Sequence, residues 1–480
     1  MGSKDQVIAE LRQLNAELSA QVHRLTVRIA ELELSLAKAK KDSSTSSKPP
    51  SSDIVKPPLK KVPGRRKKRK QGGQPGHDRK LREPLPPERV NQAFEYEIDD
   101  QEVKDCQLTP TDQFEVIQHI ELLESPIEVI EHRLRIYRTA DGQQITPDVP
   151  ELKRPIFGPR MLAMIGWLKS RAHCSYSTIE TWMEDVLDVP VSRGYLAKLC
   201  TGTISESLKE AYQELEEAIS HQEQLGSDET SIKDNGKKHW IWCITAATFS
   251  LFHIATTRSR AVLEKLVGEE FQGFLNFDYF SANCSFAWNY DIKAQYCWAH
   301  LIRDIRFLLK HPDKKTKAWA ERLLDRSRRL FSAWHRRDEM SQEGFHRSMV
   351  THRDHFLEIV RKPPNSKEAG NLAARFTVVA FQCEDSDEVQ SYALSDDYFR
   401  FMFAEEVEPT NNHSEQQIRH CVIDRRITQG TRSAVGQRYH ERMWTAIATC
   451  GKQSRSFFHF LHESIEAKLN GQSAPSLLTN

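Results

Sequence analysis

The order of predicted strands and helix between residues 224 and 278 constrains the fold of this 480-residue chain more than any other feature. The stretch QLGSDETSIKDNGKKHWIWCITAATFSLFHIATT predicts three strands, with a hairpin turn at Asp234-Asn235-Gly236. RSRAVLEKLVG then predicts a helix, and FQGFLNFDYF is an apolar strand that ends at Asp278. The sequence therefore predicts three antiparallel strands, a helix and a fourth strand.

Acidic residues on the first and fourth of these strands give this order a chemical meaning. The order, with an acid on the first strand, is the topology of ribonuclease H. Asp228 lies in the middle of the first strand, and Asp278 ends an apolar strand, where an aspartate needs hydrogen bonds or a metal. If the fourth strand lies beside the first, the two carboxylates converge, and a later helix could bring Glu415 to the same point.

That later helix begins in PTNNHSEQQIRHCVIDRR, where either Asn411 or Asn412 could form the N-cap. Helical geometry places Glu415, Arg419 and Arg426 on one face. One interpretation is a surface ion pair that contributes about 0.3 kcal/mol. The other is a metal-binding acid beside two arginines that hold phosphate.

Three carboxylates around one point repel each other unless cations lie among them. Two Mg²⁺ or Mn²⁺ ions would use Asp228, Asp278 and Glu415 as ligands, because oxygen-only ligands favour these ions over zinc. Among 67 acidic residues, however, three suitably placed ones can arise by chance. Spacing alone leaves both interpretations open.

Residues 5–41 have apolar side chains at heptad spacing. β-Branched residues at position a, leucine at position d and one asparagine at an a position are typical of a parallel two-stranded coiled coil. The alternative is a single amphipathic helix that packs on its own domain. The predicted dimer contacts are Leu11, Asn15, Leu18, Val22, Leu25, Ile29 and Leu32.

Residues 42–93 are rich in serine, proline, glycine and basic residues, and they predict an extended linker. Eight of the eleven residues from 60 to 70 are basic, although the net charge of the chain is only +1. A solvated linker is one interpretation, but the density of charge favours binding to nucleic-acid phosphates by counterion release. The predicted contacts are Arg65, Arg66, Lys67, Lys68, Arg69 and Lys70.

The other segments complete a multidomain α+β fold. Period-two alternation in residues 94–155 predicts a small β-rich module, and residues 156–222 predict short helices with Ser177 and Ser192 as caps. These helices could form a DNA-reading helix-turn-helix or a plain bundle. Residues 300–400 predict a helical insertion in the α/β/α catalytic domain, whose two parts are 223–299 and 401–465, followed by a tail, 466–480.

The chain has no apolar leader and no stretch of 18 uncharged apolar residues, which argues against export and against a membrane span. Its nine cysteines include no C-x-x-C pair, as expected for reduced thiols in a cytoplasm.

Several stretches resemble the transposases of the insertion-sequence-66 family: SSTSSKPPSSD with GGQPGH, SDET with HWIWC, FQGFLNFDYFSAN with QYCWAHLIRDIRFL, and PTNNHSEQQIRHCVIDRRITQGTRSAVG. The resemblance implies a DDE transposase with a ribonuclease H-like core, a catalytic triad of Asp228, Asp278 and Glu415, and two Mg²⁺ ions. It assigns Arg419 and Arg426 to DNA phosphate. Asn412 and His300 match motif positions and are expected to have supporting roles, but for His300 a structural role is equally open.

The resemblance also implies partners: double-stranded DNA of the transposon ends and target, a homodimer or higher oligomer, and two small accessory proteins. The expected location is the bacterial cytoplasm, at the nucleoid during activity.

The chain departs from the family pattern at three places. The family's β-rich module commonly carries paired C-x-x-C zinc ligands, whereas this one has only Cys106, so we expect a degenerate zinc-finger-like module without zinc. Tyr279 and Phe280 replace the usual Gly-Tyr, and Arg426 replaces a lysine. Two alternatives to an active transposase remain: an inactive or domesticated dimeric DNA-binding protein, and a ribonuclease H-like nuclease without strand transfer.

Overall fold

The computed structural model describes residues 2–39, 84–96, 116–123, 126–138, 141, 143–149, 154–376, 379–382, 389–392, 397–404 and 407–478. The chain divides into two compact units, one of residues Met1–Pro57 and Asp148–Asn480, the other of residues Pro58–Pro147. The basic residues 65–70 and Cys106 lie outside the described residues, so the predictions made for them stay predictions.

The first heptads form one helix, α1, at Gly2–Ala39. The predicted contact residues whose side chains are described are exposed: Asn15, Leu18, Val22, Leu25, Ile29 and Leu32. The side chain of Leu11 is outside the described part. Near the end of α1, Leu34 and Ala37 pack against the main core, so the coiled coil and the helix packed on its own domain both stay predictions.

The unit Pro58–Pro147 has little regular structure in its described part. It contains a short 3-10 helix, η2, at Pro87–Arg89, and two antiparallel strands of two residues each, β1 at Tyr137–Arg138 and β2 at Gln144–Ile145. Apolar side chains of the alternating pattern, such as Val129 and Ile130, are exposed. Alternating apolar and polar residues form a longer sheet only where the apolar face packs against a core. The β-rich module stays a prediction.

Short helices occupy the segment 156–222, as predicted. They are α3 (Pro159–Ser170), α4 (Tyr176–Leu187), α5 (Arg193–Leu199), the π-helix η4 (Cys200–Ile204), α6 (Ser205–Ser207), α7 (Lys209–Ala218) and η5 (Ile219–His221). Ser192 caps α5 as predicted, because its hydroxyl accepts from the amide of Tyr195. The prediction for Ser177 was wrong: Ser175 caps α4, accepting from the amide of Thr178 at 3.0 Å.

A five-stranded mixed sheet forms the centre of the larger unit. Its strands are β3 (Gln224–Asp234), β4 (Lys237–Thr245), β5 (Ser250–Ala255), β6 (Phe274–Phe277) and β7 (Lys293–Tyr296), in the order β5-β4-β3-β6-β7. β4 is antiparallel to β3 and β5, whereas β6 is parallel to β3 and β7. The helix α8 (Arg260–Leu266) connects β5 to β6, and α9 (Ser281–Asn289) connects β6 to β7. The strand–strand–strand–helix–strand order is therefore present.

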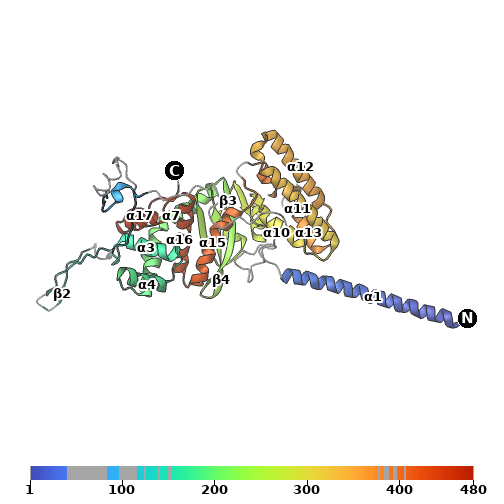
Figure 1. Cartoon of the computed structure of the whole chain (residues 1–480), viewed down its shortest axis with the longest axis horizontal. Coiled ribbons are helices and arrows are strands. Elements are labelled where there is room, and N and C mark those ends of the chain that lie inside the picture. Colours follow the sequence, from blue (N-terminus) through green and yellow to red (C-terminus); the bar gives the residue numbers. More distant parts are fainter. Residues whose placement is uncertain are drawn as a thin grey trace, which may run out of the picture. The chain divides into compact units, whose positions relative to one another are not determined.

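Helices cover both faces of this sheet. The two long helices α15 (Asn412–Thr428) and α16 (Ala434–Lys452) pack on one face, where Ile232, Cys243 and Ile418 belong to one apolar cluster (Figure 1). On the other face, Leu225 belongs to the main core together with apolar residues of α8 and α9. Side chains alternate along β3, so Gly226, Asp228 and Thr230 share the face under α15 with Ile232.

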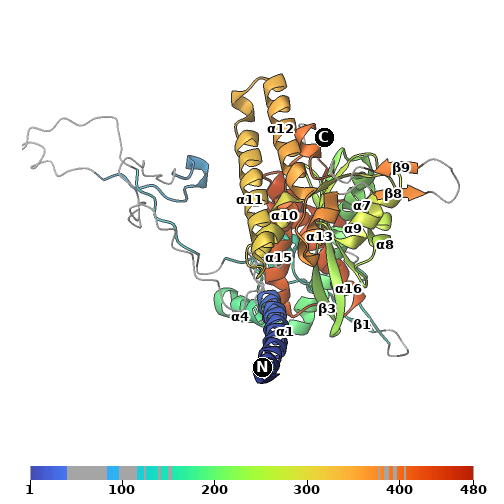
Figure 2. The same ribbon diagram turned by 90° about the vertical axis from the view of Figure 1, so that its right-hand side faces the viewer.

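The segment between the sheet and α15 is mainly helical. It contains α10 (Trp298–Leu308), α11 (Lys314–Trp334), η6 (Arg337–Glu339), α12 (Gln342–Val360), α13 (Lys367–Ala373) and η7 (Ala374–Phe376). Two strands, β8 (Val379–Gln382) and β9 (Val389–Tyr392), pair there as a hairpin, and η8 (Arg400–Met402) follows. Figure 2 shows the α11–α12 hairpin. Trp298 at the start of α10 is fully buried against the rings of Phe331, Phe356 and Phe399, which joins α10 to α11, α12 and the residues before η8.

The chain ends on the helical part of the larger unit. The last helix, α17 (Phe457–Leu469), packs against α3. Leu477 is buried in the main core beyond it.

Candidate active site

The start of α15 is fastened to β3. Gly226 permits this approach, because a Cβ atom there would collide with the side chains of Ser414 and Asn411. The side-chain amide of Asn411 donates to the carbonyl of Ser227 at 2.7 Å. Asn411 occupies the N-cap position, one of the two positions predicted for the cap, but its side chain accepts no hydrogen bond from the helix. Asn412, for which we expected a supporting role, is exposed.

The loop before α15 is also held by β6 and α10. The side-chain amide of Asn276 donates to the carbonyl of Glu408 at 2.8 Å. The amide of Trp298 donates to the carbonyl of Pro409 at 3.0 Å. These contacts come from elements far from residues 408–411 in the sequence, so the position of the first turn of α15 depends on the folded sheet.

The other end of α15 is attached to the end of β3. Gly430 has φ +108°, and a Cβ there would collide with the carbonyl of Lys233, so only glycine fits. The amide of Thr431 donates to the same carbonyl at 2.8 Å. Arg425 donates to the hydroxyl of Thr230 at 2.8 Å. The helix is thereby held along β3 at both ends, since Arg425 belongs to its last turn.

The register of β3 and β6 pairs the residues that precede the two predicted aspartates. Gly226 pairs with Asn276 in the parallel ladder. Asp228 follows two residues later within β3, and Asp278 follows two residues later, directly after the last residue of β6. Neighbouring strands lie about 4.8 Å apart, so the two carboxyl groups emerge from adjacent positions at the edge where β6 ends.

Glu415 lies in the first turn of α15, with 27% of its side chain exposed. Its carboxylate accepts from Arg303 at 3.1 Å and lies 3.6 Å from Nδ1 of His300. Arg419 and Arg426, the predicted phosphate contacts, are exposed on α15. The ion pair of Glu415 is thus made with α10 rather than with Arg419.

Arg303 was not singled out from the sequence. A signal was present, because His300 and Arg303 are three residues apart in WAHLIR and therefore share a face of a helix. Nothing local indicated that Glu415 would be their partner.

The acids affect one another electrostatically. Burial raises the pKa of Asp228 well above its ordinary value, and the charges of Glu229, Asp278 and Glu415 raise it further. Burial also raises the pKa of Asp278, and Glu415 adds to this increase, while Arg258 and Arg303 oppose it. A group of carboxyl groups with raised pKa values is short of positive charge.

Glu229 is a fourth acid at this site, next to Asp228 in the motif SDET. Its side chain is almost fully buried and accepts from Arg258 Nε at 2.7 Å. Burial and the charge of Asp278 raise the pKa of Glu229 to about 7 despite that ion pair. The side-chain amide of Asn283 donates to Asp278 at 3.3 Å. Arg258 and Asn283 therefore compensate the acids only in part.

The donor atoms suggest which metals fit. Carboxylate oxygens of Asp228, Asp278 and Glu415 suit Mg²⁺ or Mn²⁺, and the raised pKa values of the two aspartates indicate that a cation would relieve the repulsion. Within the described part, the group of three whose ligand atoms lie within 4.8 Å of one another is a different one, Cys297, His300 and Glu415. Glu415 therefore lies between two sets of potential ligands.

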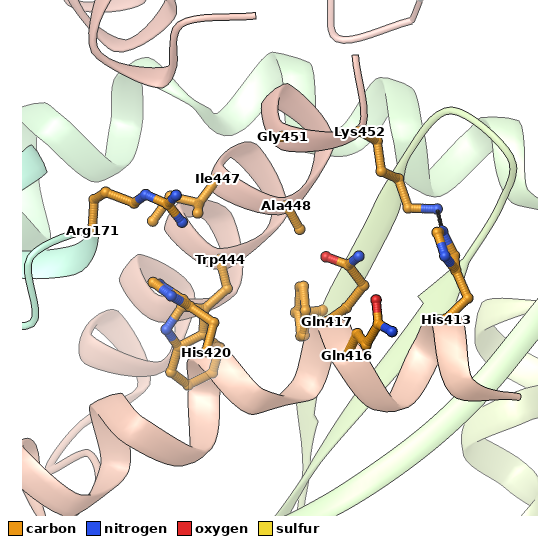
Figure 3. A pocket seen from close by; sticks show the side chains of 11 residues that line it. Arg171, His413, Gln416, Gln417, His420, Trp444, Ile447, Ala448, Gly451 and Lys452 are labelled. Atoms are coloured by element: carbon orange, nitrogen blue, oxygen red, sulfur yellow. Dashed lines mark hydrogen bonds between the residues drawn. The ribbon is translucent and has the colours of Figure 1, made fainter. Parts of the chain in front are cut away.

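A pocket of about 350 Å³ lies between α15 and α16 (Figure 3). Its lining includes Gln416, His420 and Lys452, and Lys452 Nζ lies 2.6 Å from the imidazole of His413. Burial lowers the pKa of Lys452 to about 8. None of the predicted acids lines this pocket, so it is separate from the candidate active site.

A family model described as "Transposase IS66 family" matches residues 154–439. The chain belongs to the IS66 family of transposases. The match includes all three acids of the candidate site and the sheet, α10 and α15 that hold them. A model of a family of unknown function matches residues 3–83 of this transposase, and no curated protein matches the chain. No helix in the described part is long and apolar enough to cross a membrane.

Proposed function

We propose that this transposase is a DDE enzyme that cleaves DNA at transposon ends and joins the freed 3′-hydroxyl to target DNA. Asp228, Asp278 and Glu415 are the catalytic acids. The observation that carries the proposal is the pairing of Gly226 with Asn276, because Asp228 and Asp278 each come two residues after this pair of neighbouring positions.

The three acids would hold two Mg²⁺ (or Mn²⁺) ions, which when bound supply stabilisation of the charge that develops on the attacking and leaving oxygens. The protein's own contribution is alignment. β3 and β6 fix the aspartates, the loop 408–411 fixes the helix that carries Glu415, and Arg258 lowers the repulsion among the acids. Both chemical steps are phosphoryl transfers in the same site.

The sheet supports a ribonuclease H-like core. In its order β5-β4-β3-β6-β7 the fourth strand, β6, lies beside the first, β3, which is the condition under which the two acid-bearing strands would bring their carboxylates together. The segment 300–400 interrupts this core as a mainly helical insertion.

DNA would be held at several places. Arg419 and Arg426 are exposed on the helix that carries Glu415, where they could contact phosphate. The basic residues 65–70 would bind DNA without sequence preference, and the helices of 156–222 would hold the transposon end, with α4 and α5 as the candidate helix-turn-helix. A coiled coil of α1 would join two subunits so that two ends are processed together, with two small accessory proteins as further partners.

A supercoiled-plasmid assay with the cognate ends and Mg²⁺ tests the function. Joined products are expected from a transposase. Nicked products without joining would instead indicate a nuclease, and shifted but intact DNA would indicate a binding protein.

The basic tract has its own test. Replacement of Arg65, Lys67 and Arg69 by glutamine should reduce the slope of log affinity against log salt by about 0.9 for each DNA phosphate that the tract no longer neutralises. A matched control replaces Lys314, Lys315 and Lys317, which are exposed on α11. An unchanged slope in the first variant, or an equal change in the control, would remove the tract from the DNA interface.

A further inference from the structure

Two helix starts meet beside the candidate active site. Cys297 is the N-cap residue of α10, His300 lies in the first turn of α10, and Glu415 lies in the first turn of α15. Cys297 Sγ, an imidazole nitrogen of His300 and a carboxylate oxygen of Glu415 all lie within 4.8 Å of one another. Cys297 Sγ also accepts from the amide of Asn411 at 3.1 Å, so the loop 408–411 keeps the two helices together.

The environment of His300 is the strongest evidence that these three residues bind a ligand. Only 9% of the residue is exposed, and its Nδ1 has no hydrogen-bond partner although it points to within 3.6 Å of Glu415. A buried polar atom without a partner costs free energy, so such atoms are rare unless a ligand uses them. The N-termini of α10 and α15 also favour the anionic forms of the Cys297 and Glu415 side chains, because backbone amides there carry partial positive charge.

We propose that Cys297, His300 and Glu415 form a site for Zn²⁺, or for another thiophilic divalent ion such as Co²⁺ or Cd²⁺. One sulfur, one nitrogen and one oxygen ligand, with a fourth position for water, match a tetrahedral Zn²⁺ site. Mg²⁺ does not compete well for a thiolate, so this site differs in ligand preference from the oxygen-only set of Asp228 and Asp278.

The charge and proton balance of binding is simple. The thiol of Cys297 releases its proton to solvent and binds as a thiolate, and the neutral imidazole and the ionised carboxylate complete the protein ligands. Two negative ligands then offset the charge of the ion.

The two sites share Glu415, which has a consequence that rests on the proposed function. An ion held by Cys297 and His300 keeps Glu415 on the α10 side, away from Asp228 and Asp278. Zn²⁺ therefore inhibits Mg²⁺-dependent cleavage by taking one of its three acids.

A Co²⁺ titration of the full chain tests binding independently of activity. We expect a near-ultraviolet thiolate-to-cobalt charge-transfer band that disappears in Cys297→Ser and remains in Cys174→Ser. Cys174 is a matched control because it is a partly exposed thiol in the loop between α3 and α4. Absence of the band, or equal intensity in Cys297→Ser, overturns the proposal.

A second variant tests the site without changing Cys297, in case Cys297→Ser disturbs the local fold. Loss of an outer-shell partner alone weakens metal binding by roughly 10–100-fold, so His300→Ala should weaken Zn²⁺ binding by calorimetry at least about tenfold. Unchanged affinity would remove His300 from the site.

Plasmid cleavage in Mg²⁺ with added Zn²⁺ tests the sharing of Glu415. Relative to its own Mg²⁺ activity, Cys297→Ser should need at least about tenfold more Zn²⁺ than the wild type for equal inhibition. Equal sensitivity overturns the link between the sites. If the wild type has no Mg²⁺-dependent activity, the proposed function fails, whereas the cobalt band still decides the zinc site.

Discussion

The helix α15 carries two acids, Glu415 near its start and Asp424 near its end. The pKa values of the carboxyl groups at these two ends are shifted in opposite directions. Around Glu415, burial and mutual repulsion raise the pKa values of Asp228 and Asp278. Asp424 is fully buried, which by itself would raise its pKa, but contacts with His173 and His440 outweigh burial, and the pKa falls well below its ordinary value.

The contacts of Asp424 explain this contrast. Its Oδ2 accepts from the indole of Trp444 at 3.0 Å and lies 3.1 Å from Nδ1 of His440, while Oδ1 lies 3.8 Å from Nδ1 of His173. The acids at the other end have each other as neighbours. Partners, rather than burial, therefore decide whether an acid stabilises the fold, and the end where Arg258 and Arg303 compensate the acids only in part is the one suited to bind cations.

The largest expected effect is on catalysis at the acid-rich end. Asp228→Asn and Glu415→Gln should each lower plasmid cleavage by about 10³-fold or more, since metal-assisted charge stabilisation supplies several kcal/mol and each 1.36 kcal/mol is tenfold in rate. DNA binding measured by mobility shift should persist. Asp325→Asn, at an exposed position on α11, is the control. Full activity of either active-site variant would show that the triad is wrong.

The next effect is on stability at the opposite end. Asp424→Ala should lower the free energy of unfolding by about 3–5 kcal/mol, because it leaves the buried indole of Trp444 without its acceptor and buried His440 without its carboxylate neighbour. Chemical denaturation measures the change. Asp424→Asn keeps an acceptor for the indole and should lose less. An unchanged denaturation midpoint for the alanine variant would mean that Asp424 is not a structural acid.

The third prediction uses pH to separate the two ends. The pKa of Glu229 rises from 4.5 to about 7, so the metal-free folded state holds its proton more tightly than the unfolded chain. This contribution to stability is present at low pH and is lost as pH rises from 4.5 through 7. Asp424 has the opposite sign: its contribution is present above its unfolded pKa and is lost as pH falls.

Mg²⁺ competes with protons at the acid-rich end, so it should raise Tm more at about pH 8 than at about pH 5. Thermal unfolding with and without Mg²⁺ measures this. The difference should vanish in Asp228→Asn and remain in Asp325→Asn. An equal Mg²⁺ shift at both pH values would contradict the assignment of these acids to a cation site.

The smallest effect is a gain in stability. Asp228→Asn removes one charge from a repelling group, so the metal-free variant should melt a few degrees higher than the wild type at about pH 8. Calorimetry in chelator measures it. A lower Tm would indicate that Asp228 is compensated as Asp424 is.

Local patterns predicted the elements that carry the site. Alternating residues and the turn at residues 234–236 were enough to predict β3, β4 and β5, and the apolar strand before Asp278 predicted β6. In residues 94–155 the same kind of pattern is not tested in full: most of the described apolar residues are exposed and, within the described part, only β1 and β2 form. A period-two pattern of apolar residues predicts one strand, whereas a sheet also requires a second strand to pair with and packed residues that cover its apolar face.

By itself, the sequence determined which acids lie at strand ends and at the start of a helix, because backbone periodicity and turn chemistry act over a few residues. Only the tertiary structure decided that Glu415 pairs with Arg303, that Asn411 anchors the helix to β3, and that Cys297 and His300 face Glu415. Those contacts join segments more than a hundred residues apart in the chain. They depend on the order of strands in the sheet and on where glycine lets a helix approach it, and neither is set by neighbouring residues.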